Sequence, residues 1–229
     1  LENPGIPAFL EQELPALAAL GPVIIANLSG SSVDEYAEGA QLLAASSITM
    51  IELNISCPNV KAGGMAFGLD PDAASEVTRS VRRAAPHKPL IVKLSPNAPD
   101  LCAIARACVD EGADALSLVN TFKAMAIDIY GRKPVFDLIS AGLSGPAIRP
   151  IALRMVWEVC HAVAIPVIGM GGIATASDAL EFLMAGAAAV EVGSATFARP
   201  PAMNEIIAGI AAYMRRYNVA TLADLRIGD

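Results

Sequence analysis

Short apolar runs recur along the chain, and stretches with helical spacing of apolar residues lie between most of them. The runs are nearly continuous in Val, Ile, Leu and Ala, which is typical of parallel strands covered on both faces. We predict strands at residues 23–27, 50–55, 90–94, 115–120, 166–170 and 188–193. The pattern therefore predicts an α/β chain built from repeated strand–helix units.

The intervening stretches carry signals for the starts and ends of helices. Ser32 is a suitable cap, Pro71 suits a first helical turn, and Gly186 stands where left-handed caps end helices. We predict helices at residues 33–45, 72–85, 100–111, 150–162, 177–185 and 201–217. In the long connection from 120 to 150, residues 127–130 and 135–138 read as a hairpin around a turn. The hairpin is either decoration or a lid over the strand ends.

Repeated strand–helix units give either a doubly wound sheet or a (β/α)8 barrel. Active sites of barrels collect at the C-terminal ends of all strands, whereas a doubly wound sheet concentrates them at one switch point. Nearly every predicted strand ends in a polar residue or a glycine: Asn27, Asn54, Lys93, Asn120, Gly171 and Gly193. We therefore predict a single (β/α)8 TIM-barrel domain over residues 1–229. Only six strands are visible, so we expect the first two strands of the barrel to be missing from the N-terminus.

Composition narrows the function classes. The chain has 229 residues, 54% apolar and 17% charged, which argues against disorder. A net charge of −7 argues against a nucleic-acid surface. Apolar runs stop after roughly ten residues, short of the roughly 20 that a membrane span needs. No signal-peptide pattern opens the chain. Cys102, Cys108 and Cys160 lie in helical stretches and are interpreted as buried free thiols of a reducing cytoplasm.

The segment NISCPN at 54–59 leaves a predicted strand and enters the glycine-rich VKAGG at 60–64. Pro58 restricts Cys57 to extended conformations, which fixes the direction of its thiol. A cysteine pKa of about 8.5 leaves some thiolate at neutral pH, so Cys57 can act as a base or a nucleophile. An isolated cysteine is more often structural, but the flanking Asn54 and Asn59 at a strand end favour a catalytic one.

Lys93 lies within the apolar segment 91–94, where a lysine is costly to bury without a partner. An anionic cofactor is one such partner, and Glu52 or Asp114 on a neighbouring strand is the alternative. Asn120 is followed by Thr121 at the end of another predicted strand. An asparagine offers both donors and an acceptor, which suits a planar ligand with amide edges. Alternatively, Asn120 caps the next loop.

Two glycine segments lie after the last predicted strands. Loops at these positions of a barrel commonly hold a phosphate, because glycine lets backbone N–H groups approach the anion. The candidate contacts are Gly171, Gly172, Gly193 and Ser194. The sequence shows no metal-ligand spacing and no Ser-His-Asp arrangement, and its two histidines lie beside helical stretches. A phosphate-bearing ligand is the prediction.

Taken together, these segments resemble class 1 dihydroorotate dehydrogenases. The resemblance is carried by NISCPN at 54–59, VKLSP at 92–96, GLSGPA at 142–147, IGMGG at 168–172 and VGS at 192–194. It runs in order over almost the whole chain. The class 2 membrane enzymes use a serine as base, so Cys57 indicates class 1. The KAGG at 61–64 resembles subclass B, which works with an iron–sulfur flavoprotein subunit and passes electrons to NAD.

The resemblance implies oxidation of dihydroorotate to orotate in UMP biosynthesis, with FMN as hydride acceptor and Cys57 as the base that takes a proton from C5. The implied substrate contacts are Asn54, Asn59, Asn120 and Thr121. The implied FMN contacts are Asn27, Asn54, Lys93, Gly145, Gly171, Gly172, Gly193 and Ser194, with Lys93 also catalytic. A cytoplasmic homodimer would bind a subunit that carries FAD and an iron–sulfur cluster, which gives a heterotetramer.

The chain departs from the family pattern at its start. The part that precedes this point in family members normally supplies two strands, another flavin-contacting lysine and another substrate asparagine. We therefore expect residues 1–229, made alone, to aggregate or oligomerise and to bind FMN poorly, because an open barrel leaves edges unpaired. Two alternatives remain open: a pyrimidine-reducing barrel like that of dihydropyrimidine dehydrogenase, and a non-catalytic barrel fragment. Assays with dihydroorotate and dihydrouracil, and the yellow colour of flavin, distinguish them.

Overall fold

The structure is a computed structural model that describes residues 3–56 and 67–228. The chain divides into two compact units. The N-terminal unit holds Leu1–Leu94 with Cys102–Leu116, and the C-terminal unit holds Ser95–Leu101 with Ser117–Asp229. Strand β4 (Ala115–Leu118) begins in the first unit and ends in the second.

Six strands form one sheet in the order β1-β2-β3-β4-β9-β10. The pairs β1–β2, β2–β3 and β9–β10 are parallel. The order follows the sequence from one edge to the other, as in a barrel, whereas a doubly wound sheet reverses its order at a switch point. The six predicted strands are confirmed, with ends that differ by no more than two residues. Besides β4 they are β1 (Ile25–Leu28), β2 (Met50–Asn54), β3 (Leu90–Lys93), β9 (Val167–Met170) and β10 (Ala189–Glu191).

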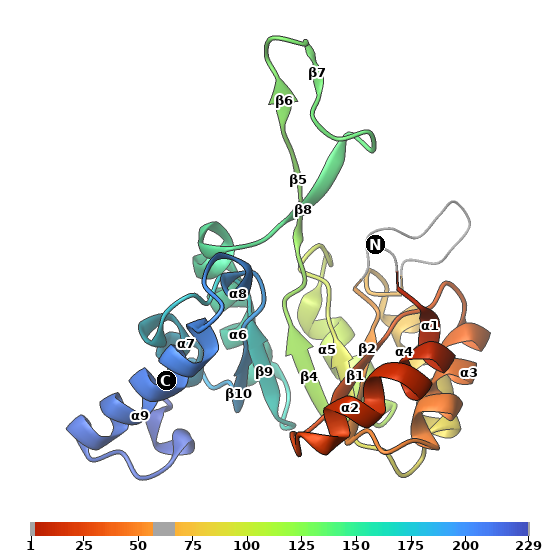
Figure 1. The fold of residues 1–229 in the computed structure, drawn as a ribbon, viewed down its shortest axis with the longest axis horizontal. Coiled ribbons are helices and arrows are strands. Elements are labelled where there is room, and N and C mark those ends of the chain that lie inside the picture. The colour runs from red at the N-terminus through yellow and green to blue at the C-terminus, as the bar shows by residue number, and fades with distance from the viewer. Residues whose placement is uncertain (1–2, 57–66, 229) are drawn as a thin grey trace. The chain divides into compact units, whose positions relative to one another are not determined.

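In the N-terminal unit a helix follows each strand: α3 (Val33–Ala44), α4 (Pro71–Ala84) and α5 (Leu101–Asp110). The predicted cap is confirmed, because the Ser32 side chain accepts a hydrogen bond from Glu35 N at 3.2 Å. Asp70 caps α4 in the same way. Helices α3 and α4 pack side by side (Figure 1). Their apolar faces and the strands form a core that includes Tyr36, Leu43, Ile51, Leu53, Val77 and Val81.

The sequence did not predict the helical segment that opens the chain. It consists of α1 (Gly5–Ala8), a π-helical turn (Phe9–Glu13) and α2 (Leu14–Ala19). Pro7 and Pro15 look like helix breakers in the sequence, but both lie close to helix starts, where a missing N–H is tolerated. The segment packs on α3 at Gly39, where an added Cβ would lie 2.9 Å from Ile6 of α1 and 2.6 Å from Leu28 of β1. Glycine is therefore required for this close approach.

The C-terminal unit contains α6 (Arg149–Ala162), α7 (Ala176–Met184) and α9 (Ala202–Tyr217), as predicted, and a one-turn helix α8 (Ala195–Ala198) that was not. Gly186 follows α7 with a φ of 108°, which confirms the predicted left-handed position. Leu180 and Leu183 of α7 pack on Leu225 in the final 3-10 turn (Leu222–Leu225). Tyr213 of α9 covers this cluster.

Residues 122–143, here called the arm, form two successive antiparallel pairs. Strand β5 (Phe122–Met125) pairs with β8 (Ser140–Leu143), and β6 (Ile127–Asp128) pairs with β7 (Lys133–Pro134). The arm extends from the rest of the C-terminal unit (Figure 1). The prediction of a second strand at 135–138 was wrong, because those residues form turns that end at Ile139, which has a φ of 65°.

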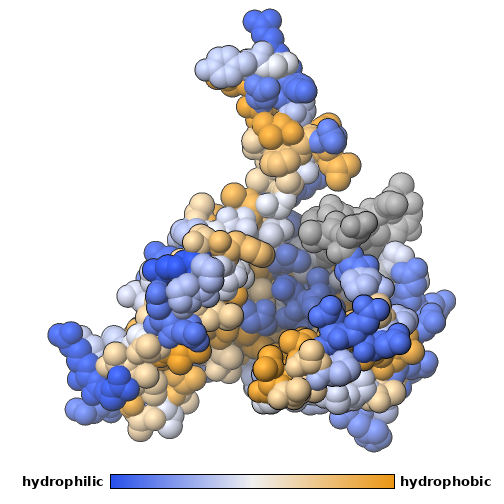
Figure 2. Space-filling model, viewed as in Figure 1, coloured by the Kyte–Doolittle hydropathy of each residue, from blue (hydrophilic) through white to orange (hydrophobic). Residues whose placement is uncertain are grey.

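Apolar side chains on the arm are exposed, and Figure 2 shows them as hydrophobic patches along it. Tyr130 is 93% exposed, Leu138 78% and Ile129 72%. Apolar residues in a strand are usually buried on one face. Among the described residues, nothing in the C-terminal unit covers these apolar side chains of the arm. An exposed apolar surface of this extent is typical of contact with another molecule.

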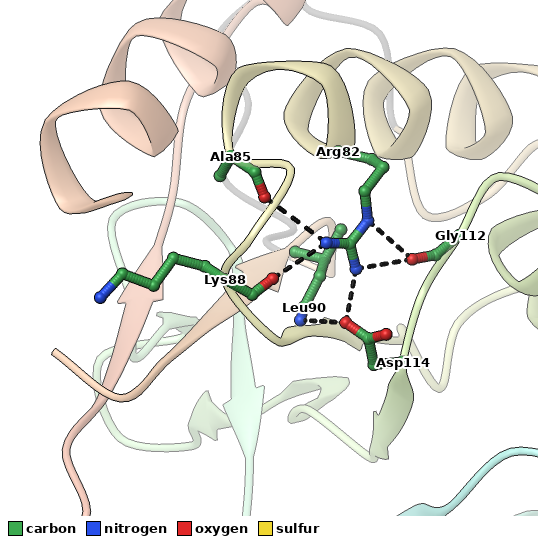
Figure 3. A network of polar contacts seen from close by, with 6 residues as sticks. All are labelled: Arg82, Ala85, Lys88, Leu90, Gly112 and Asp114. Atoms are coloured by element: carbon green, nitrogen blue, oxygen red, sulfur yellow. Dashed lines mark hydrogen bonds and ion pairs between the residues drawn. The ribbon is translucent and has the colours of Figure 1, made fainter. Parts of the chain in front are cut away.

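Arg82 of α4 holds together the loops at the start of β3 and β4 (Figure 3). Its guanidinium donates to Gly112 O at 2.9 and 2.7 Å and to Lys88 O at 2.9 Å. It also pairs with Asp114, whose carboxylate accepts from Leu90 N at 2.7 Å. One side chain thus fixes the entry of two adjacent strands.

Replacing Arg82 with alanine is expected to lower the free energy of unfolding by about 2–3 kcal/mol, because hydrogen bonds to charged groups contribute about 1.5–3 kcal/mol. Urea denaturation of the purified protein measures the loss. The control is Arg83→Ala on the same helix, an exposed position where a change within about 0.5 kcal/mol is expected. Equal losses for the two variants would contradict the role of Arg82.

Candidate functional site

In the N-terminal unit, four polar side chains meet at the C-terminal ends of β1, β2 and β3. The register pairs Asn27 with Glu52 and Asn54 with Lys93. Asn27 Nδ2 donates to Glu52 Oε2, and Lys93 Nζ lies 3.7 Å from the same oxygen. Asn54 Nδ2 donates to Asn27 Oδ1 at 3.2 Å. The sequence-predicted residues Asn27, Asn54 and Lys93 therefore form one connected cluster around Glu52.

Hydrogen bonds fix both the side chain and the backbone of Asn54. Its Oδ1 accepts hydrogen bonds from Ser56 Oγ at 2.6 Å and from Ser56 N at 3.2 Å. The Tyr36 hydroxyl from α3 donates to Asn54 O at 2.7 Å. These contacts fix the orientation of the amide directly before residues 57–66. Cys57 and Asn59, the predicted base and one predicted substrate contact, lie outside the described residues.

Glu52 is one of the partners that the sequence left open for Lys93, and the structure shows the two side chains as an ion pair. The 3.7 Å separation is longer than a hydrogen bond, and the Lys93 side chain keeps 17% of its surface exposed. The pair therefore does not exclude an anionic ligand at Lys93. Sequence reasoning treated Glu52 only as a partner. The available signal was its position two residues before Asn54, which places both side chains on one face of β2.

In the C-terminal unit, a pocket of about 440 Å³ follows β9 and β10. Three predicted FMN contacts, Gly145, Gly172 and Ser194, line it. Gly172 has a φ of 79°, and an added Cβ there would lie 2.8 Å from Gly145 O. Only glycine at 172 lets these two segments approach so closely, so the predicted glycine motifs meet at one pocket wall.

Gly171 and Gly193 have different surroundings. Gly171 has a φ of 122°, and an added Cβ would lie 2.8 Å from the Ala152 side chain, so it permits close packing of the β9 end on α6. Gly193 O accepts hydrogen bonds from Thr196 N at 3.0 Å and from its hydroxyl at 2.8 Å, at the start of α8. Their contacts with a phosphate stay predictions.

Arg199, which sequence reasoning missed, lines the same pocket. Its Nη2 donates to Ala174 O at 3.2 Å and lies 3.1 Å from Glu205 Oε2. No sequence pattern marks this arginine, because it follows the one-turn helix α8. A guanidinium beside glycine-rich backbone suits an anion such as phosphate, since charge-assisted hydrogen bonds to phosphate are strong.

Asn120 and Thr121 lie at the base of the arm. Thr121 N donates to Asn120 Oδ1 at 2.8 Å, which is the local loop contact that the sequence left open as an alternative. Asn97 braces this turn, because its amide donates to Thr121 O and accepts from Lys123 N. An added Cβ at Gly142 would lie 2.4 Å from Thr121 Oγ1. The turn is thus closely packed, and the substrate role of both residues stays a prediction.

Cys108 and Cys160 are buried thiols, as predicted, whereas the predicted burial of Cys102 was wrong. Burial raises the pKa of Cys108 to about 12 and that of Cys160 to about 11, so both stay protonated at neutral pH. Cys102 is only partly buried. Within residues 3–56 and 67–228, no group of three or more His, Cys, Asp or Glu side chains could hold a metal ion. No helix in the same ranges is both long and apolar enough to cross a membrane.

The sequential strand order and the polar residues at the strand ends place the chain among proteins with a (β/α)-barrel type of fold. Comparison with known proteins narrows this class. The family model for dihydroorotate dehydrogenase matches residues 1–214. The chain therefore belongs to the dihydroorotate dehydrogenase family.

Curated relatives agree with this family. A protein of Petrotoga mobilis is 56% identical over 226 residues, which cover 99% of this chain and 75% of the relative. A protein of Alkaliphilus metalliredigens is 49% identical, with 99% and 74% covered. A protein of Pelobacter propionicus is 53% identical, with 98% and 74% covered. Each of the three is named dihydroorotate dehydrogenase B (NAD(+)), catalytic subunit.

Proposed function

We propose that the chain oxidises dihydroorotate to orotate with bound FMN, as a catalytic subunit in pyrimidine biosynthesis. The observation that carries the proposal is the cluster of Asn27, Asn54 and Lys93, which occupies the strand ends where the family resemblance puts flavin and substrate contacts. The dehydrogenase activity is supported by the name dihydroorotate dehydrogenase B (NAD(+)), catalytic subunit, which relatives 49–56% identical to this chain share.

The residues present fit FMN. In the C-terminal unit, Gly145, Gly172 and Ser194 line the pocket that would hold the phosphate, together with the guanidinium of Arg199, which is ion-paired with Glu205. Contacts from Gly171 and Gly193 are implied by the family resemblance. In the N-terminal unit, Lys93 and Asn27 would contact the ring with a cation and an amide. Bound FMN would supply the hydride acceptor, while the protein supplies orientation and electrostatics.

Amide side chains would bind the substrate through hydrogen bonds. Asn54, Asn59 and Asn120, with Thr121, offer donors and acceptors that match the carbonyl and N–H edges of a dihydropyrimidine ring. Cys57, as a thiolate, would take the proton from C5 of dihydroorotate while the hydride leaves C6. The described contacts of Asn54 with Ser56 and Tyr36 support this arrangement, because they fix the strand end that leads into Cys57.

We further propose how the electrons leave. The printed names of the relatives include NAD(+) and the words catalytic subunit, which imply an acceptor and a second kind of subunit for those proteins. For this chain we propose a cytoplasmic homodimer that joins an electron-transfer subunit carrying FAD and an iron–sulfur cluster, as a heterotetramer. The exposed apolar surface of the arm supports contact with another chain.

The substrate role of Asn120 gives a direct test. Asn120→Ala should weaken orotate binding by about 1–3 kcal/mol, because a buried polar group of the ligand loses its partner. Bound FMN per protein should stay constant. Calorimetry with orotate and the flavin absorbance measure the two quantities. The control is Asn204→Ala on the exposed face of α9. If Asn120→Ala loses FMN but binds orotate normally, the residue serves the cofactor and the assignment is wrong.

A further inference from the structure

Glu52 is a buried carboxylate among the residues proposed to contact the flavin. Its side chain is only 5% exposed, on the central strand of the β1–β2–β3 group. One of its oxygens meets both Asn27 Nδ2 and, at 3.7 Å, Lys93 Nζ. A buried carboxylate costs several kcal/mol unless charges and hydrogen bonds compensate it. The family resemblance assigns Glu52 no role.

The ion pair between Glu52 and Lys93 changes the charge that these strand ends present to a ligand. Lys93 alone would present one positive charge at the end of β3. With Glu52 beside it the cluster presents an ion pair, whose field at a neighbouring ligand is much weaker than that of a lone cation. Charges a few ångströms apart with little solvent between them interact strongly, so this carboxylate matters to whatever contacts Lys93.

We propose that Glu52 is a positioning residue that balances the charge of Lys93 and thereby lowers the reduction potential of bound FMN. The inference rests on the proposed function, in which the flavin ring contacts Lys93. Reduction adds negative charge to the ring, so a nearby cation favours it and a nearby anion opposes it. Glu52 also holds Asn27 through a hydrogen bond, which fixes the second ring contact.

A lowered potential has a chemical consequence. NAD⁺ is a weak oxidant, so electrons from dihydroorotate can reach it only if the flavin between them does not hold them too tightly. A lone Lys93 would stabilise the reduced state and retard the onward transfer. The Lys93–Glu52 pair therefore suits a catalytic chain whose electrons go to a nicotinamide.

The test is the potential of bound FMN in the full protein, measured by reductive titration against a reference dye. Glu52→Gln keeps the size and an oxygen for Asn27 but removes the charge. It should stabilise reduced over oxidised FMN at least tenfold, an upward shift of about 30 mV for a two-electron couple. Lys93→Gln should shift the potential downward. The double variant should return toward the wild-type value.

Two variants separate charge from structure. Glu52→Asp keeps the charge and should stay closer to the wild-type potential than Glu52→Gln. The matched control is Glu111→Gln, which removes another carboxylate of the N-terminal unit that is ion-paired, with Arg79. It should leave the potential unchanged. An unchanged potential in Glu52→Gln, or equal shifts in the Gln and Asp variants, would overturn the inference while FMN binding upholds the proposed function. If the wild-type protein binds no FMN, both fall together.

Discussion

Replacing Cys57 with alanine is expected to lower turnover with dihydroorotate by about 10²–10⁴-fold, the usual range for loss of a general base. The alanine cannot accept the C5 proton, while the flavin and the amide contacts remain. Cys57→Ser should regain activity only at high pH, because a hydroxyl ionises far less readily than a thiol. Steady-state rates and the anaerobic rate of flavin reduction measure the effect.

The matched control for this prediction is Cys102→Ala. Cys102 is a partly buried cysteine on α5, outside the predicted site, so its replacement should leave turnover nearly unchanged. The wild-type rate should rise as pH increases toward the ordinary thiol pKa of about 8.5, because the base must be deprotonated. Near-normal turnover of Cys57→Ala at neutral pH would contradict the assignment of Cys57 as the catalytic base.

Gly172→Ala is expected to weaken FMN binding by about 10²-fold, or about 2.7 kcal/mol. The added Cβ would lie 2.8 Å from Gly145 O and 2.9 Å from Arg149 N, and the φ of 79° disfavours any residue with a side chain. The wall formed by Gly145 and Gly172 must therefore shift, which deforms the pocket proposed for the phosphate. Fluorescence titration with FMN and with riboflavin measures the change.

The loss should be larger for FMN than for riboflavin, since only FMN carries the phosphate. Gly228→Ala is the control, because an added Cβ there meets nothing within 4 Å. Circular dichroism establishes that each variant is folded before binding is compared. A folded Gly172→Ala protein that binds FMN like the wild type would show that the pocket holds something else.

The strands of the sheet could be predicted because their signal is local. Each lies in a short apolar run bounded by polar residues or glycine, and burial on both faces leaves little freedom in composition. The opening helical segment was not predicted; it contains Pro7 and Pro15, which a helix tolerates only near its start. The arm was misassigned at 135–138, because its apolar residues Val135, Phe136 and Leu138 belong to an exposed turn and not to a strand.

Site residues could be predicted where they lie in a recognisable sequence motif. They could not be predicted where only the fold brings them together. Asn27, Asn54 and Lys93 were found from strand ends. Glu52, which contacts Asn27 and Lys93, could be found only from the register of three strands. Arg199 lines the pocket from a one-turn helix that carries no pattern of its own. The loop contact of Asn120 could be predicted, because it involves only the adjacent residue. The hydrogen bond from Thr121 N to Asn120 Oδ1 matches the loop cap that the sequence left open beside a ligand contact.

The central claim is that this chain belongs to an enzyme that uses FMN to oxidise dihydroorotate, and anaerobic titration of the purified full-length protein tests it most directly. Dihydroorotate should bleach the flavin absorbance at one equivalent per bound FMN and yield orotate, while dihydrouracil should leave the spectrum unchanged. Released cofactor should migrate as FMN. A flavin-loaded protein that dihydroorotate does not bleach, or that dihydrouracil bleaches equally well, would contradict the account.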